Sequence, residues 1–69
     1  MITLTNDRRH GVHIYDNGSL RVIVYKVGTT WTCRAGTKLI GMTAPKTDAL
    51  ETFTRRKDAE NYALSYLRD

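Results

Sequence analysis

The chain is short, basic and poor in cysteine: it has 69 residues, a net charge of +4 and a single cysteine, Cys33. A chain of this length forms one domain, and one cysteine excludes an internal disulfide, so packing must stabilise the fold. The longest apolar run, residues 22–25, is far too short to cross a bilayer. We therefore expect a cytoplasmic protein without a membrane span.

A hairpin is expected near the start of the chain, after an N-terminal segment or short strand in residues 1–10. The pair Asn17-Gly18 is typical of a type I′ turn, in which both central residues adopt positive φ and the backbone twist matches the flanking strands. The turn predicts that residues 11–16 pair with residues 19–27.

A further strand is expected in the stretch TTWTCRA, where Trp31 and Cys33 share one side and polar residues alternate with them. Residues 37–43 predict another strand, weakened by a central glycine, so that residues 11–43 would supply the antiparallel strands. Residues 44–52 contain the only proline and predict a loop.

The last part of the chain predicts a helix over residues 54–68, with Thr54 as its N-cap. Its apolar residues recur three and four positions apart, which places them on one face, and we expect that face to pack against Trp31. The apolar residues are Ala59, Tyr62, Ala63, Tyr66 and Leu67. The basic residues 55–57 stand where cations oppose the helix dipole, either as a solvated first turn or as a selected basic patch.

These elements predict a single domain, residues 1–69, of the α+β class. Its antiparallel sheet would have three or four strands, and the C-terminal helix would pack on one face. One helix covers only one face of a sheet. Apolar residues on the other face must therefore meet solvent, the N-terminal segment or a partner.

The turn at Gly28 decides which face stays uncovered. A two-residue type II′ loop at Gly28-Thr29 puts Trp31 on the face that takes the helix. The residues outside would then be Ile14, Arg21, Ile23, Tyr25, Thr32 and Arg34. A three-residue loop reverses the faces, and the outer residues become His13, Tyr15, Leu20, Val22, Val24 and Arg34. We favour the first register because it places Arg21 and Arg34 in water.

The sequence contains no pattern typical of an active site or a bound cofactor. His10 and His13 have H-x-x-H spacing, but no close cysteine pair completes a structural zinc site. Cys33 lies on the Trp31 face, where we expect burial and low reactivity. We therefore expect a protein that is not an enzyme and uses neither a cofactor nor a metal.

The hairpin and the helix carry a resemblance to a known family. The string Tyr15-Asp16-Asn17-Gly18-Ser19, followed by an alternating basic strand and later by Phe53, Ala59-Glu60 and Tyr62, is similar to a small type I-F anti-CRISPR family. Members of that family are phage-encoded and block the Cas surveillance complex by binding it. The resemblance implies a non-enzymatic inhibitor that acts in the host cytoplasm, with Tyr15 as a contact residue.

A second resemblance is to the integrase arm-binding and plant AP2-type DNA-binding domains, which have three strands and a helix. Trp31, Gly36 and Lys38 in TWTCRAGTK, with Phe53 and Ala59 in FTRRKDAE, match their recurring marks. In those domains the uncovered sheet enters the major groove, which implies a DNA-binding accessory or regulatory protein. The residues available for that role are Arg21, Tyr25, Lys26, Arg34, Lys38 and Lys46.

The functional prediction is a stoichiometric binding protein that inhibits a host defence complex, with DNA binding as the alternative. Its partner would be a host protein or ribonucleoprotein, the Cas surveillance complex first among them, and no membrane is involved. A symmetric homodimer through the same patch is the competing outcome. The predicted partner-binding residues are Tyr15, Arg21, Ile23, Tyr25, Arg34 and Lys38.

Overall fold

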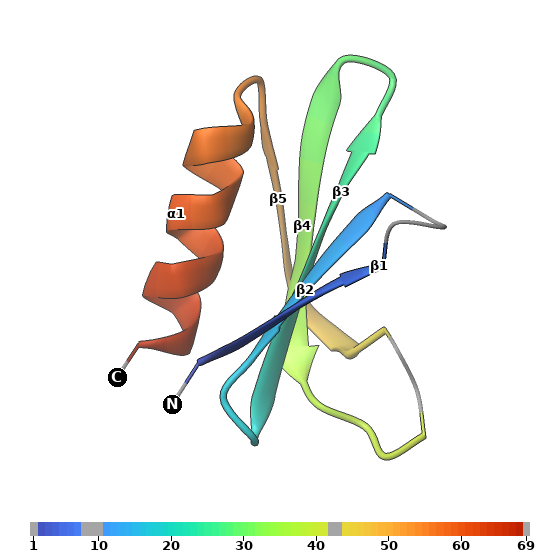
Figure 1. The fold of residues 1–69 in the computed structure, drawn as a ribbon, viewed down its shortest axis with the longest axis vertical. Coiled ribbons are helices and arrows are strands. Elements are labelled where there is room, and N and C mark those ends of the chain that lie inside the picture. The colour runs from blue at the N-terminus through green and yellow to red at the C-terminus, as the bar shows by residue number, and fades with distance from the viewer. Residues whose placement is uncertain (1, 8–10, 42–43, 69) are drawn as a thin grey trace.

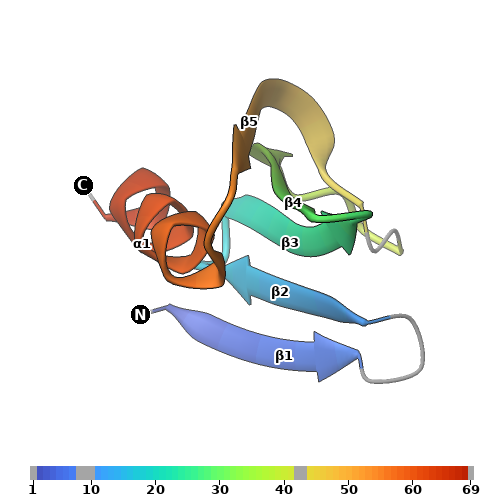
Figure 2. The same ribbon diagram turned by 90° about the horizontal axis from the view of Figure 1, so that it is seen from above.

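Five strands and one helix make up the part of the chain that the computed structural model describes, which comprises residues 2–7, 11–41 and 44–68 (Figure 1). The strands are β1 (Thr3–Asp7), β2 (Val12–Asp16), β3 (Leu20–Val27), β4 (Thr30–Thr37) and β5 (Lys46–Phe53), and the helix is α1 (Arg56–Leu67). The strands form one antiparallel sheet in the order of the sequence. The helix lies on one side of this sheet, against β2 to β5 (Figure 2).

The α+β class is confirmed, but the sheet has five strands where three or four were expected. The predicted loop over residues 44–52 is wrong, because β5 occupies most of that segment. Pro45 precedes the strand, so it removes no donor from the ladder. Conversely, β4 ends at Thr37, and residues 38–41 form no strand. Residues 42–43, also part of that predicted strand, lie outside the described residues.

The turn between β2 and β3 differs from the predicted type I′ turn. Asp16 pairs with Arg21 across the two strands. The backbone N–H of Asn17 donates to the carbonyl oxygen of Leu20 at 3.1 Å, so Gly18 and Ser19 are the central residues of the turn. The φ angle of Gly18 is 99°, but Ser19 does not have positive φ, since no described residue other than glycine does. A type I′ turn needs positive φ at both central residues, so this turn is of another type.

Asn17 takes the first position of that turn because its side chain satisfies the backbone there. Its Oδ1 accepts hydrogen bonds from the amides of Ser19 at 3.1 Å and Leu20 at 2.8 Å. The register shifts by two residues from the expected one. Because side chains alternate with a period of two, the same residues still share a face.

The turn between β3 and β4 is the two-residue loop that we favoured. Val27 pairs with Thr30, and of the two loop residues only Gly28 has positive φ, 63°, as in a type II′ turn. Trp31 and Cys33 therefore lie on the face that takes the helix. The buried core on that face consists of Tyr15, Val22, Val24, Cys33, Ala35, Ala59, Ala63 and Leu67.

The helix begins two residues later than predicted. Its N-cap is Arg55, without a side-chain hydrogen bond, so the prediction that Thr54 caps it is wrong. Ala59 and Ala63 are completely buried, and their small side chains let the helix approach the sheet closely. Tyr62, Tyr66 and Trp31 are partly buried and pack around this core, as the sequence predicted. Within the described chain, no helix is long and apolar enough to span a bilayer.

Candidate functional site

The sheet face opposite α1 is the candidate site, and we call it the open face. Along β2, β3, β4 and β5 it consists of Val12, Ile14, Arg21, Ile23, Tyr25, Thr32, Arg34, Leu50 and Thr52. Contacts among the described elements join either neighbouring strands or α1 and the sheet, so none of these elements covers the open face.

Two cross-strand rows form the centre of the open face. In the first row, Ile14 faces Ile23, Ile23 faces Arg34, and Arg34 faces Leu50. In the second row, Val12, Tyr25, Thr32 and Thr52 follow one another across the same strands. Directly opposite side chains on one face lie about 5 Å apart, so each row is a continuous surface of contacting groups.

The open face has a closed floor and exposed projections. Ile14 and Ile23 are only 8% and 7% exposed, so they form the buried floor of this face. The prediction that Ile23 is an exposed contact residue is therefore wrong. Leu50 is 56% exposed, Arg34 and Thr52 are exposed and Tyr25 is half-buried, so these side chains are accessible on the open face.

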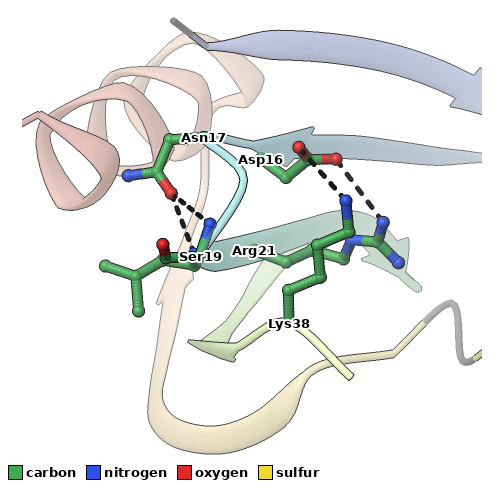
Figure 3. Close-up of polar contacts among 6 residues, drawn as sticks. Asp16, Asn17, Ser19, Arg21 and Lys38 are labelled. Atoms are coloured by element: carbon green, nitrogen blue, oxygen red, sulfur yellow. Dashed lines mark hydrogen bonds and ion pairs between the residues drawn. The ribbon is translucent and has the colours of Figure 1, made fainter. Parts of the chain in front are cut away.

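A polar cluster of Asp16, Arg21 and Lys38 lies at one end of the open face (Figure 3). The carboxylate of Asp16 lies 3.4 Å from Nη2 of Arg21 and 3.8 Å from Nζ of Lys38. The amide of Lys38 also donates to the carbonyl oxygen of Ser19 at 2.9 Å, which holds the end of β4 against the turn between β2 and β3. Asp16 thus compensates two of the cations that were predicted to bind a partner.

Arg34 differs from those two cations. It is exposed, and within the described part of the chain it has neither a hydrogen bond nor an ion pair. Its neighbours across the ladder are the apolar Ile23 and Leu50. Among the described residues, the guanidinium of Arg34 therefore lies on the open face without an anionic partner, between two apolar side chains.

Three other residues that the sequence predicted as binding residues do not belong to the open face. Tyr15 is 6% exposed beneath α1, so it cannot be a surface contact, and burial raises the pKa of its hydroxyl, with the carboxylate of Glu60 adding to the rise. Lys26 projects on the helix side, where its Nζ lies 5.8 Å from the centroid of the Trp31 ring. Lys46 is exposed at the start of β5.

Sequence reasoning missed Leu50, which it placed in a loop. The stretch ALETF does alternate, because Ala49 and Phe53 are half-buried toward the helix while Leu50 and Thr52 project on the open face. The signal is weak since a strand at the edge of a sheet buries few side chains. The proline at its start further concealed it.

Nothing among the described residues forms a metal centre, since no three His, Cys, Asp or Glu side chains group together there. His10 lies outside the described residues. Cys33 is completely buried, and its thiol donates to the carbonyl oxygen of Ala59 at 3.5 Å. Burial, together with the carboxylate of Glu51, raises the pKa of this thiol to about 11. A buried thiol of this kind is a poor nucleophile.

The raised pKa of Cys33 predicts that the protein loses stability in alkali. In the unfolded chain the thiol ionises near pH 9.0, whereas in the folded chain it ionises near pH 11. Its contribution is complete below about pH 9 and is lost as the pH rises to about 11, up to about 2 to 3 kcal/mol. Urea unfolding at several pH values should show this decline, and Cys33→Ala should flatten it. An equally steep decline in Cys33→Ala would assign the effect to other groups.

Comparisons with known proteins name no relative: no family model, no curated protein and no solved structure matches the chain.

Proposed function

We propose that the chain is a non-catalytic binding protein that attaches its open face stoichiometrically to another protein. The proposed partner is a host defence complex, and the resemblance of the hairpin to small phage inhibitors suggests the Cas surveillance complex as the first candidate. The observation that carries this proposal is the row in which Arg34 stands between Ile23 and Leu50 on a face that no described element covers.

The composition of the open face supports protein binding. Interfaces gain most of their affinity from a few aromatic and arginine side chains surrounded by apolar contacts. Tyr25, Arg34 and Leu50 project from a floor of buried isoleucines in this way. When a partner buries the Arg34 guanidinium, its charge must be met by a carboxylate or phosphate, since a buried unpaired charge is very costly.

The distribution of the cations favours a protein over duplex DNA. Affinity for DNA depends on neutralising several phosphates at once. Of the basic residues proposed for DNA, Arg21 and Lys38 share the carboxylate of Asp16, and Lys26 lies on the opposite face. Lys46 is exposed at the start of β5. Among the described residues of the open face as defined above, Arg34 is the one cation without an ion pair, which is too few to follow a duplex backbone.

Substitutions on the open face should weaken binding without altering stability. We expect Arg34→Ala and Leu50→Asp each to cost about 2 kcal/mol, or about 30-fold in affinity for a type I-F Cas surveillance complex. Biolayer interferometry measures the affinity. The melting temperature of each variant should equal that of the parent, because both side chains are exposed.

Arg68→Ala is the matched control for Arg34→Ala, because Arg68 is an exposed arginine just after α1 and lies away from the open face. It should bind the complex like the parent. Unchanged binding by both open-face variants would refute this site, and a parent that does not bind the complex would refute this target.

Analytical ultracentrifugation identifies the competing homodimer, which the same variants would convert to monomers. Tight, steeply salt-dependent binding of duplex DNA would restore the DNA alternative.

A further inference from the structure

A second surface lies on the helix side, at the end of the molecule that carries both the turn between β3 and β4 and the start of α1 (Figure 1). The ring of Trp31 stands among cations there. Nζ of Lys26 lies 5.8 Å from the ring centroid, and Cζ of Arg56 lies 6.0 Å from it. We call Trp31, Lys26 and residues 55–57 the tryptophan cluster.

The register of the sheet assembles the tryptophan cluster from three elements. Lys26 pairs with Trp31 across β3 and β4, and Phe53 pairs with Trp31 across β4 and β5. The strand β5 ends at Phe53 and the helix begins at Arg56, so residues 55–57 lie at the start of the helix, with the Arg56 guanidinium over the indole. Two cations from distant parts of the sequence, Lys26 and Arg56, thus meet at one aromatic side chain, and Arg55 and Lys57 flank Arg56 in the chain.

Most of these cations are not compensated. The Arg56 Nε donates to the carboxylate of Glu60 at 2.8 Å. Lys26, Arg55 and Lys57 are exposed and have no ion pair within the described chain. Cations in the first turn of a helix oppose its dipole, and Asp58 offsets only part of their mutual repulsion. Lys26 and Arg56 both lie over the Trp31 ring, so packing around the indole accounts for these two cations but not for Arg55 and Lys57.

We propose that the tryptophan cluster binds single-stranded nucleic acid. Single strands are bound by cations that neutralise the phosphates together with aromatic rings on which unpaired bases stack. Trp31 is only partly buried and provides the ring, while Lys26, Arg55 and Lys57 provide the charges. A duplex fits this cluster poorly because its base faces are already stacked and cannot contact an indole.

Fluorescence of the chain tests this proposal directly, because Trp31 is the only tryptophan. Titration with an oligothymidylate of about 12 nucleotides at low salt should quench its emission. If three or four phosphates are neutralised, the logarithm of affinity should fall with the logarithm of salt with a slope of about −2 to −3.

Matched lysine variants locate the binding surface. Lys26→Gln and Lys57→Gln should each weaken binding several-fold and make the slope shallower by about 0.7. Lys46→Gln removes the same charge at the opposite end of β4, where Lys46 pairs with Thr37, and should bind like the parent. Arg34→Ala should also bind like the parent, which separates this surface from the open face. Thermal melts verify that each variant is folded.

Four results would overturn the proposal. The first is emission that stays unquenched at about 50 mM salt, and the second is a loss of affinity in Lys46→Gln as large as in Lys26→Gln. The third is equal quenching by a polyglutamate peptide of matched charge, which would indicate a general polyanion surface. The fourth is tighter binding of a duplex of the same length.

Discussion

Ala63→Asp is expected to leave the protein unfolded at room temperature. Ala63 is completely buried between α1 and the sheet, in the core that also contains Val22 and Cys33. A carboxylate there would lose its hydration without gaining a cation, and such a charge costs several kcal/mol. A domain of this size has a total stability of only about 3 to 10 kcal/mol, so one such cost removes most of it.

Asn61→Asp is the control for this experiment, because it places the same carboxyl group on the exposed side of the same helix. It should change the unfolding free energy by less than about 0.5 kcal/mol. Far-UV circular dichroism during heating distinguishes the two variants. A cooperative transition of Ala63→Asp near that of the parent would mean that the helix does not pack on the sheet through this residue.

Gly36→Ala is the second substitution with a large expected effect. A Cβ atom at Gly36 would collide with the backbone carbonyl of Lys46 and would approach the amide of Asp48. These groups belong to β5, where the pairing with β4 is shifted by an irregularity between Ala35 and Gly36. Backbone atoms cannot rotate away as a side chain can, so the start of β5 must move, at a cost of about 2 to 3 kcal/mol.

Urea denaturation measures this cost, and hydrogen exchange locates it. The amides of β5 should exchange faster in Gly36→Ala than in the parent, because the ladder to β4 is weakened where the strand begins. Thr37→Ala is the control, since Thr37 is the exposed neighbour and its truncation creates no collision. Equal stability of the two variants would show that β5 tolerates the extra methyl group.

Displacement of β5 should also reach the open face, since Leu50 is carried by this strand opposite Arg34. Gly36→Ala is therefore expected to weaken partner binding although Gly36 itself is buried and projects no side chain.

The sequence by itself determined the features that depend on local periodicity. The alternation around Trp31 and Cys33 predicted β4, and the apolar spacing from Ala59 to Leu67 predicted the buried face of α1. The sequence allowed a two-residue or a three-residue loop at Gly28 and favoured the two-residue loop, which the structure has. A turn of that length leaves only one phase for the following strand. All of these signals arise between residues that are close in the chain.

Only the tertiary structure decided which of those side chains a partner can reach and which charges are left uncompensated. Asp16 meets both Arg21 and Lys38 because the register of β2 and β3 and the path after β4 converge there. Ile23 is buried although it lies on the face opposite α1, while β5 joins the sheet with few buried side chains of its own. Such contacts depend on residues far apart in the sequence, and neither composition nor periodicity records which of them become neighbours.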